Sequence, residues 1–428
     1  MELKKYKLGE IANILVGYPF PSEDFNILGK GVRLVRGMNV SERFLRFGDD
    51  TRWWDNLTDD LLPYYLQEND IVIGMDGSKV GKNFALVKKE DLPLILVQRV
   101  ACIRAKENFC QGYLWQYIAS PRFVEYVNTI KTGSSIPHIS GKQIANFPIY
   151  APSLDQQSRI ASVLSSLDSK ISLNRRINAK LETIAKRLYD YWFVQFDFPD
   201  ENGKPYKSSG GKMVWNDELK REIPEGWEVK SVAETIECDI SGDWGEEEIK
   251  GNYTYKVSCI RGCDMANMTY LPTRFILASN SKKQLKSDDF VIEISGGSPT
   301  QSTGRIVHIT DEIIKRFNNK VICSNFCRGL RLKSKDYVSY FLQMWNMFYC
   351  NGVFFNFEGK TSGLKNFQFD TFVAQYWYFP PKEMAKKYHN IISKLQKNID
   401  KNETEIMSLT ALRDKLLPLL MNGQVEVA

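Results

Sequence analysis

Residues 71 to 83, IVIGMDGSKVGKN, join a run of β-forming residues to a glycine-rich loop ending in Gly81 and Lys82. Such a loop is typical of phosphate binding, because backbone amides and a lysine can surround phosphate oxygens. A nucleotide-binding P-loop, however, has four residues between its first glycine and the Gly-Lys pair, followed by Ser or Thr for magnesium. Here only three residues separate Gly77 from Gly81, and Asn83 takes the hydroxyl position. The segment therefore predicts either a loop for another polyanion or an ordinary tight turn.

A similar loop occurs in the second half of the chain, where residues 294 to 306, ISGGSPTQSTGRI, carry Gly304-Arg305 in place of Gly81-Lys82. It belongs to a series of matched segments that keep their order at offsets of 219 to 227 residues. The pairs are YKLGEIA with WEVKSVA, LVRGMNV with CIRGCDM, LQENDIVI with LKSDDFVI, QRVACIR with NFCRGLR, and YLWQYI with YVSYFL. A common order within so narrow a range of offsets indicates an internal duplication.

Three pairs of polar loops recur in this duplication. They are Arg36-Gly37 with Arg261-Gly262, residues 78–83 with 300–305, and Thr132 to Ser135 with Gly359 to Gly363. Amides, hydroxyls and guanidinium groups at loop tips suit phosphates and base edges. Solvated turns with ordinary surface charge explain any single residue equally well, but the recurrence of the whole set favours a function. The net charge of +6 and the pI of about 8.7 permit an anionic partner.

Catalytic motifs are missing from the sequence. It has no Gly-x-Ser-x-Gly elbow, H-E-x-x-H helix or G-x-G-x-x-G fingerprint, and none of its three histidines recurs in the other repeat. Pro199-Asp200 followed by Glu218-Leu219-Lys220 imitates the carboxylates and lysine of a nuclease metal site. These residues flank the polar stretch ENGKPYKSSGGK, whereas such a site needs carboxylates held on a rigid sheet. Nuclease chemistry is therefore disfavoured.

Two C-x3-C pairs, Cys259 with Cys263 and Cys323 with Cys327, raise the question of a zinc site. Both lie among apolar, strand-like residues, in YKVSCIRGC and KVICSNFC. We favour buried thiols over zinc ligands at these positions.

Two long helices must position the recurring loops. Apolar residues at alternating spacings of four and three indicate a coiled-coil seam of about 29 residues, roughly 44 Å long, after each globular half. Pro152 precedes one helix and Pro380-Pro381 the other. Two unrelated surface helices are the alternative, but equal stripes with a matching polar position favour an antiparallel pair with Asn174 opposite Asn402. The predicted seam consists of Ile160, Leu164, Leu167, Ile171, Asn174, Leu181 and Leu188 with Ile392, Leu395, Ile399, Asn402, Leu409 and Leu416.

Several longer segments, taken together and in order, resemble the specificity subunits of type I restriction-modification enzymes, and the likeness covers essentially the whole chain. They are IYAPSLDQQSRIASVLSSLDSKISLNRRIN, LYDYWFVQFDFP, EIPEGWEVKSV and LTALRDKLLPLLMNGQV. The loops IVIGMDGSKVGK and TGSSIPHIS are also similar to elements of that family.

The resemblance implies an α+β fold with two similar globular α/β target-recognition domains, separated by two long helices in an antiparallel coiled coil with pseudo-twofold internal repeat. The expected segments are a first recognition domain (1–152), a spacer helix (153–190), a connector (191–226), a second recognition domain (227–381), a second spacer helix (382–422) and a tail (423–428).

The implied function is non-catalytic recognition of double-stranded DNA. Each domain would read one half of a bipartite, asymmetric site, and the coiled coil would set the spacing between the halves. Two copies of a methyltransferase subunit, which uses S-adenosylmethionine on adenine N6, and ATP- and magnesium-dependent restriction/translocase subunits would dock on this chain, which would bind no cofactor itself. A coiled-coil adapter spacing two protein- or ligand-binding modules is the alternative.

Lys82 and Arg305 are expected to meet phosphate, whereas the residues before them reach base edges. The residues expected at DNA are Arg36, Ser78, Lys79, Lys82, Asn83, Ser134, Ser135, His138, Arg261, Gln301, Ser302, Thr303, Arg305, Lys360, Thr361 and Ser362. The acidic segment Glu237 to Glu248 should lie away from phosphate.

A charged start and the lack of a membrane-length apolar run predict a cytoplasmic location without membrane contact.

Overall fold

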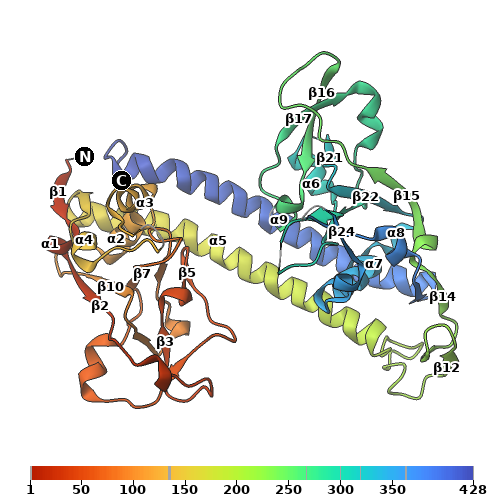
Figure 1. Cartoon of the computed structure of the whole chain (residues 1–428), viewed down its shortest axis with the longest axis horizontal. Helices are drawn as coiled ribbons and strands as arrows, with labels where there is room; N and C mark the ends of the chain where they lie inside the picture. Colours follow the sequence, from red (N-terminus) through yellow and green to blue (C-terminus); the bar gives the residue numbers. More distant parts are fainter. Residues whose placement is uncertain are drawn as a thin grey trace. The chain divides into compact units, whose positions relative to one another are not determined.

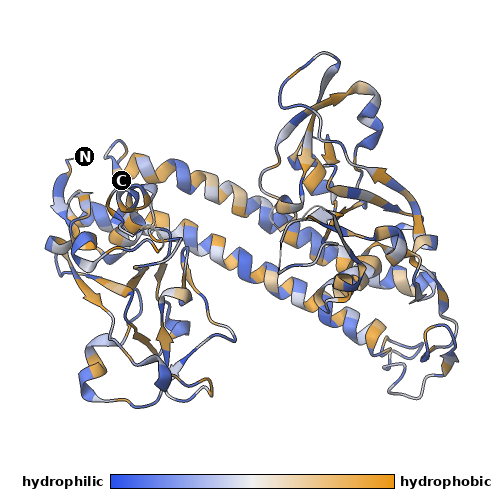
Figure 2. Cartoon of the chain, in the orientation of Figure 1, coloured by the Kyte–Doolittle hydropathy of each residue, from blue (hydrophilic) through white to orange (hydrophobic). Residues whose placement is uncertain are grey.

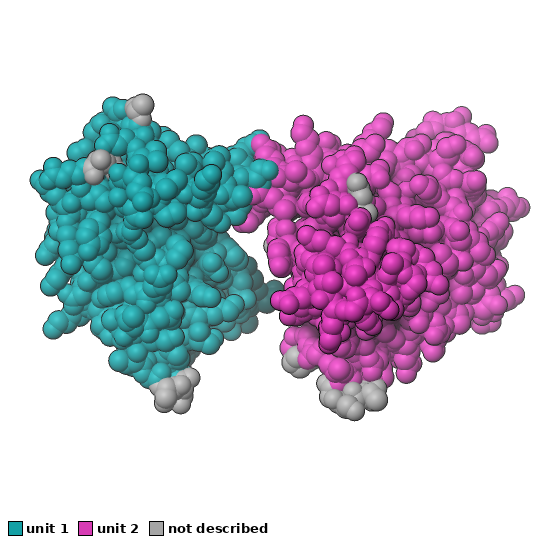
Figure 3. All heavy atoms as spheres, turned by 90° about the horizontal axis from the view of Figure 1, so that it is seen from above, with its two compact units in different colours: residues 1–172, 408–428 teal, residues 173–407 magenta. Residues whose placement is uncertain are grey.

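The computed structural model describes residues 2–133, 136–266, 268–298, 300–318, 320–361 and 364–427. It divides into two compact units, residues 1–172 with 408–428 and residues 173–407 (Figure 3). Each unit contains one globular domain and part of two long helices, α5 (Leu154–Tyr189) and α9 (Lys382–Met421). No described helix combines the length and apolar character needed to cross a membrane.

The first domain is built on a four-stranded antiparallel sheet in the order β2-β10-β7-β8 (Figure 1). A three-stranded sheet, β6-β3-β9, and the pair β1-β11 complete its main strands, and β3 runs parallel to β9. The bounds are β1 (Lys4–Lys7), α1 (Leu8–Ile11), β2 (Ala12–Val16), β3 (Val32–Val35), β4 (Val40–Ser41), β5 (Phe44–Leu45), β6 (Trp53–Trp54), β7 (Ile71–Gly74), β8 (Phe84–Leu86), β9 (Leu94–Leu96), β10 (Val100–Ala105), α2 (Gln111–Ile118), α3 (Pro121–Ile130), α4 (Gly141–Ala145) and β11 (Pro148–Ala151).

The second domain repeats this topology with the sheets β15-β22-β18-β20, β17-β16-β21 and β14-β25, and β16 again runs parallel to β21. The sheet β19-β24-β23 corresponds in the first domain to single bridges that join Asp76 and Thr132 to His138, and a hairpin, β12-β13, precedes the second domain. The bounds are β12 (Met213–Asn216), β13 (Arg221–Pro224), β14 (Glu228–Ser231), β15 (Ile236–Ser241), β16 (Tyr253–Ile260), β17 (Thr273–Leu277), β18 (Phe290–Glu293), β19 (Ser295–Gly296), β20 (Ile306–His308), α6 (Asp311–Arg316), β21 (Val321–Cys323), β22 (Cys327–Leu332), α7 (Val338–Cys350), β23 (Glu358–Thr361), β24 (Leu364–Phe367), α8 (Phe369–Val373) and β25 (Tyr376–Phe379).

Buried polar contacts also recur at matched positions. In the first domain Arg104 donates from Nε and Nη2 to Asp70, both at 2.7 Å. In the second, Arg331 donates in the same way to Asp289, at 2.7 and 2.8 Å. Both carboxylates are almost fully buried, so each pair is an internal support of the fold rather than a surface contact. This recurrence agrees with the predicted duplication.

The helical region from Gln111 to Ile130 is divided into α2 and α3, with Ser120 in an extended conformation between them. Pro121 occupies the first turn of α3, where its missing N–H costs no helical hydrogen bond, whereas continuing α2 through it would clash with the preceding turn.

The ends of the long helices belong to the domain cores. In the first unit Ile160 and Leu164 of α5 share a core with Leu417 and Leu420 of α9. In the second, Tyr189 and Tyr388 share a core with the strands of the second domain. Alternating hydrophilic and hydrophobic bands run along both helices (Figure 2). The helices contain 36 and 40 residues, longer than the predicted 29, because they continue into these cores.

The two helices pair antiparallel, because rising numbers in α5 meet falling numbers in α9. Asp168 accepts from Arg413 at 3.0 Å in the first unit, and the Tyr388 hydroxyl donates to the Ala185 carbonyl in the second. The predicted pairing of Asn174 with Asn402 is wrong by about one turn. Asn402 donates to Asn178 at 2.8 Å, and the Asn174 amide donates to a glutamate of α9.

The predicted seam residues differ in how deeply they are buried. The buried ones are Ile160, Leu164, Ile171, Asn174 and Ile392, and the half-buried ones are Leu167, Leu181, Leu188, Leu395, Ile399, Asn402, Leu409 and Leu416. The buried asparagine amides find carboxylate partners from α9, so they avoid the cost of an unsatisfied polar group.

The prediction of buried thiols in the two C-x3-C pairs is confirmed at three of the four positions and wrong at Cys263. Cys259, Cys323 and Cys327 are buried, whereas Cys263 is exposed. Burial raises the pKa of Cys259 and of Cys327 to about 12. Within the described residues, no group of three or more His, Cys, Asp or Glu side chains is placed to hold a metal ion.

Thiol titration of the folded chain is expected to reflect this burial. The exposed Cys263 and Cys350 should react rapidly with a disulfide reagent at pH 8, because their sulfurs are accessible. Cys259, Cys323 and Cys327 should react only after denaturant is added. Mass spectrometry of the labelled peptides would identify each site, and rapid native labelling of Cys323 would contradict the expectation.

Candidate nucleic-acid interface

The β7–β8 hairpin presents the polar loop of the first domain. Gly77 and Gly81 adopt φ values of +95° and +90°, which a side chain would strain. A Cβ at Gly81 would lie 2.9 Å from the Val127 side chain, so the loop packs directly on α3. The Gly77 amide donates to the Pro137 carbonyl at 3.0 Å. The hairpin is therefore held firmly at its glycines.

The side chains predicted to contact DNA project from this fixed hairpin. Ser78, Lys79 and Lys82 are exposed, and Asn83 is half-buried. The neighbouring His138 is exposed and joins the loop's support, since it exchanges backbone hydrogen bonds with Thr132. The predicted Ser134 and Ser135 lie outside the described residues.

The matched arginines Arg36 and Arg261 occupy equivalent turns but have different partners. Their backbone amides donate to Asn39 and Asp264 respectively, both at 3.0 Å. The Arg261 guanidinium also forms two hydrogen bonds to Asp264, which raise its pKa. The Arg36 guanidinium donates to the Asp50 carbonyl at 2.6 Å, and burial lowers its pKa. Both side chains are only half-buried, so part of each guanidinium remains accessible.

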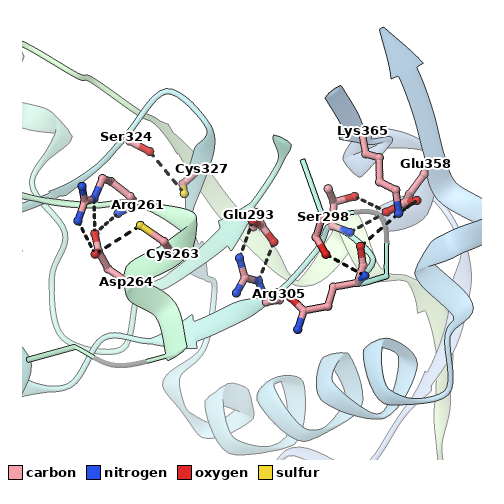
Figure 4. Close-up of polar contacts among 12 residues, drawn as sticks. Arg261, Cys263, Asp264, Glu293, Ser298, Arg305, Ser324, Cys327, Glu358 and Lys365 are labelled. Atoms are coloured by element: carbon pink, nitrogen blue, oxygen red, sulfur yellow. Dashed lines mark hydrogen bonds and ion pairs between the residues drawn. The ribbon is translucent and has the colours of Figure 1, made fainter. Parts of the chain in front are cut away.

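In the second domain, the loop between β19 and β20 is anchored by a distant hairpin (Figure 4). Glu358 of β23 accepts from the backbone amide of Thr303 at 2.7 Å and forms an ion pair with Lys365 of β24 at 3.2 Å. Lys365 also donates to the Gln301 carbonyl at 3.2 Å. The Gln301 backbone is thereby fixed while its side chain stays exposed.

Two other predicted residues of the second domain are not presented to solvent. Ser302 and Thr303 are 4% and 2% exposed, so they support the loop and do not offer hydroxyls to a base edge. Lys360 and Thr361 belong to β23, but their side chains lie outside the described part of the chain, as does the whole of Ser362.

Arg305 differs from the sequence prediction in two ways: in the group that it contacts within the chain and in the residue of the first domain to which it corresponds. Its Nε and Nη2 donate to Glu293 at 2.8 and 2.7 Å, so it is not a free phosphate-binding cation (Figure 4). Strand register explains the difference. Ile306 pairs with Ile292 as Phe84 pairs with Ile73, and Arg305 therefore corresponds to Asn83 rather than to Lys82.

Three charged residues of this site were missed by the sequence analysis: Glu293, Glu358 and Lys365. Glu293 could have been found from the sequence. It directly follows the matched segment, at a position where the first repeat has the uncharged Gly74. Glu358 and Lys365 have no such sequence signal, because the matching segments of the first domain, which are joined by single bridges to His138, carry no such charged pair among their described residues. In the acidic segment, Glu247 pairs with Arg274 at 2.9 Å.

The described structure is thus a duplicated domain, with a polar hairpin turned by a positive-φ glycine in each copy, combined with two long paired helices. Comparison with known proteins shows a similarity to the specificity subunits of type I restriction-modification enzymes. Residues 1–183 match the family model described as the type I restriction modification DNA specificity domain. The curated relatives are named as specificity subunits of type I restriction enzymes.

Individual relatives illustrate this similarity. The chain is 27% identical over 345 residues to the type I restriction enzyme MjaIX specificity subunit of Methanocaldococcus jannaschii, which covers 78% of this chain and 74% of the relative. It is 36% identical over 168 residues to the EcoAI specificity subunit of Escherichia coli, covering 38% of this chain and 27% of the relative. The crystal structure of a type I S subunit from M. genitalium covers 98% of this chain and 96% of its own, with a TM-score of 0.60 and 15% identity, and so shares the fold.

Proposed function

We propose that this chain selects the DNA site of a type I restriction-modification complex, with residues 1–152 and 227–381 each reading one half of a bipartite, asymmetric sequence. The observation that carries this proposal is the duplication. Two copies of one topology each present a polar hairpin turned by a glycine of positive φ, Gly81 in one and Gly304 in the other. Two non-identical readers on one chain suit a site with two different halves.

The paired helices suit the role of a spacer between the half-sites. A helix of 36 residues rises about 54 Å, which exceeds one turn of B-DNA at about 34–36 Å. Its ends are built into the two domain cores through Ile160 and Tyr189. A change in helix length would therefore be transmitted to the separation of the readers.

A further part of the proposal concerns the partner subunits. Leu173, Ile177, Ile184 and Tyr191 are all more than a third exposed, and their spacings of four and seven residues place them on one face of α5 and its continuation. An exposed apolar stripe of this kind suits docking of a methyltransferase subunit. We propose two such copies, using S-adenosylmethionine, with ATP- and magnesium-dependent subunits added for restriction, while this chain itself binds none of these cofactors.

Lys82→Ala is expected to weaken binding of the assembled complex to all DNA sequences alike. Lys82 is exposed at the tip of the first-domain hairpin, where an ammonium group suits a phosphate. Loss of one phosphate contact should reduce the slope of log affinity against log salt by roughly 0.9. Lys89→Ala, an exposed lysine beyond the other end of β8, is the matched control and should leave the slope unchanged. Equal slopes for wild type and Lys82→Ala would exclude the contact.

Gln301→Ala is expected to act differently, by relaxing discrimination at one base pair. Its backbone is fixed by Lys365 and Ser298 while its amide is exposed, and a side-chain amide can hydrogen bond in two directions to adenine. Binding to a panel of duplexes with single changes in the second half-site should lose about tenfold or more of its preference at one position. Gln375→Ala, another exposed glutamine of the second domain, should keep every preference.

A further inference from the structure

A polar hollow of about 250 Å³ lies at the end of β18, beside the loop that carries Gln301. Arg305 and Glu293 line one part of it, and the glycines Gly296 and Gly297 line another. The Arg305 side chain is 26% exposed, so solvent reaches part of its guanidinium, whereas the Glu293 side chain is only 7% exposed. The hollow therefore combines a buried carboxylate with a partly accessible cation.

The ion pair fixes the direction of the guanidinium. Glu293 takes the Nε and Nη2 protons on one edge, and within the described residues these are the hydrogen bonds that the Arg305 side chain makes. A guanidinium has five N–H donors in a rigid plane, so the edge formed by Nη1 and the second proton of Nη2 remains able to donate. Backbone contacts add rigidity, because the Glu293 amide donates to the Arg305 carbonyl at 2.9 Å.

The first domain shows that the fold does not need this pair. The buried pairs of Arg104 with Asp70 and Arg331 with Asp289 recur in both copies, as expected for supports of the fold. The positions of Glu293 and Arg305, in contrast, are taken in the first domain by Gly74 and Asn83. A buried charged pair is costly unless well compensated, so its presence in one copy alone points to a task specific to that copy.

The chemistry of the free edge favours a base over a phosphate. Pairing with Glu293 offsets the positive charge of Arg305, which weakens its attraction for any phosphate, but leaves two parallel donors at a fixed angle. Two such donors match the O6 and N7 acceptors that guanine presents in the major groove. Lys82, which is exposed, has the character of a phosphate contact instead.

We propose that Arg305 reads a guanine of the second half-site and that Glu293 is the positioning residue that aims it. A Cβ at Gly262 would lie 2.6 Å from Glu293 Oε1, so a glycine makes room for the carboxylate. The inference rests on the proposed function, and it adds a guanine at a base pair distinct from that read by Gln301.

The test measures binding of the full chain, assembled with its methyltransferase subunits, to a library of duplexes randomised in both half-sites. The wild-type complex should require guanine at one position of one half-site. Arg305→Ala and Arg305→Lys should both lose about tenfold or more of that preference, because lysine keeps the charge but not the two parallel donors. Glu293→Gln should weaken the same preference while raising affinity for unrelated DNA, since it leaves the guanidinium charge without its partner.

A double variant serves as a control for loss of binding caused by misfolding. Glu293→Gly with Arg305→Asn installs the residues that the first domain carries at these positions, so it should fold, as thermal melting would show, and still lose the guanine preference. A uniform loss of affinity in Arg305→Ala that Arg305→Lys restores would identify a phosphate contact and overturn the inference. Unchanged preferences in all variants would overturn it as well. A wild-type complex that prefers no sequence at all would instead contradict the proposed function.

Discussion

Arg331→Ala is expected to lower the free energy of unfolding of the second unit by roughly 3–5 kcal/mol, because it leaves a buried carboxylate without its partner. Asp289 is fully buried and accepts both hydrogen bonds from Arg331, at 2.7 and 2.8 Å. Its remaining contact is the Lys286 backbone amide at 2.7 Å, which cannot neutralise the charge. Urea denaturation followed by tryptophan fluorescence would measure the loss.

Arg328→Ala is the matched control for this prediction. Arg328 lies on the same strand, β22, but its partners Asp239 and Asp370 are exposed, so its ion pairs should contribute about 1 kcal/mol or less. Arg104→Ala should reproduce the large effect in the first unit, where Asp70 holds the equivalent place. Equal, small losses for Arg331→Ala and Arg328→Ala would mean that the Arg331–Asp289 pair contributes no more to stability than an exposed ion pair.

The duplication could be predicted from the sequence because its signals are local. The segments around Asp70 and Asp289, and those ending in Arg104 and Arg331, keep their residue types and order, and the structure shows why: in each domain they form the same buried ion pair. Pairs of residues that must meet across a sheet preserve their types even where the loops between them change.

Register was predictable only approximately. Apolar spacing predicts two long helices, but a shift by one turn places equally apolar residues opposite each other, so it could not distinguish Asn174 from Asn178 as the partner of Asn402. The alignment of the polar loops of the two domains is also uncertain by one residue when it is made from the sequence. Matching Gly304-Arg305 to Gly81-Lys82 is off by one position, because the strand pairing that defines the correspondence is not visible in the loop sequence.

The site residues also include some whose exposure could be predicted from the local sequence and some whose burial could not. Exposure of Lys82 and Gln301 follows from polar residues at the tip of a tight turn. Burial of Ser302 and Thr303 does not, because the loop is held by a distant segment: the Thr303 amide donates to Glu358, more than fifty residues away in the sequence. Contacts between segments far apart in the sequence therefore decide which polar residues of this loop face solvent.

Trp345→Ala is expected to lower the free energy of unfolding of the second unit by roughly 3–5 kcal/mol. Trp345 is fully buried on α7, and its ring lies 5.0 Å from the ring of Phe372 and 5.1 Å from that of Phe354. Truncation would leave a large cavity among these aromatic side chains. Urea denaturation of the variant beside wild type would give the change in stability.

Trp345→Phe separates packing from loop positioning. The Trp345 indole N–H donates to the buried Gly304 carbonyl at 2.7 Å, directly beside Arg305. Phenylalanine keeps most of the apolar contact but leaves that carbonyl unsatisfied, at a cost of about 1–3 kcal/mol. Since the carbonyl belongs to the turn that aims Arg305, this variant should stay folded at 25 °C yet show a weaker guanine preference. A stable Trp345→Phe variant with every sequence preference intact would mean that the ion pair with Glu293 alone is enough to aim the guanidinium.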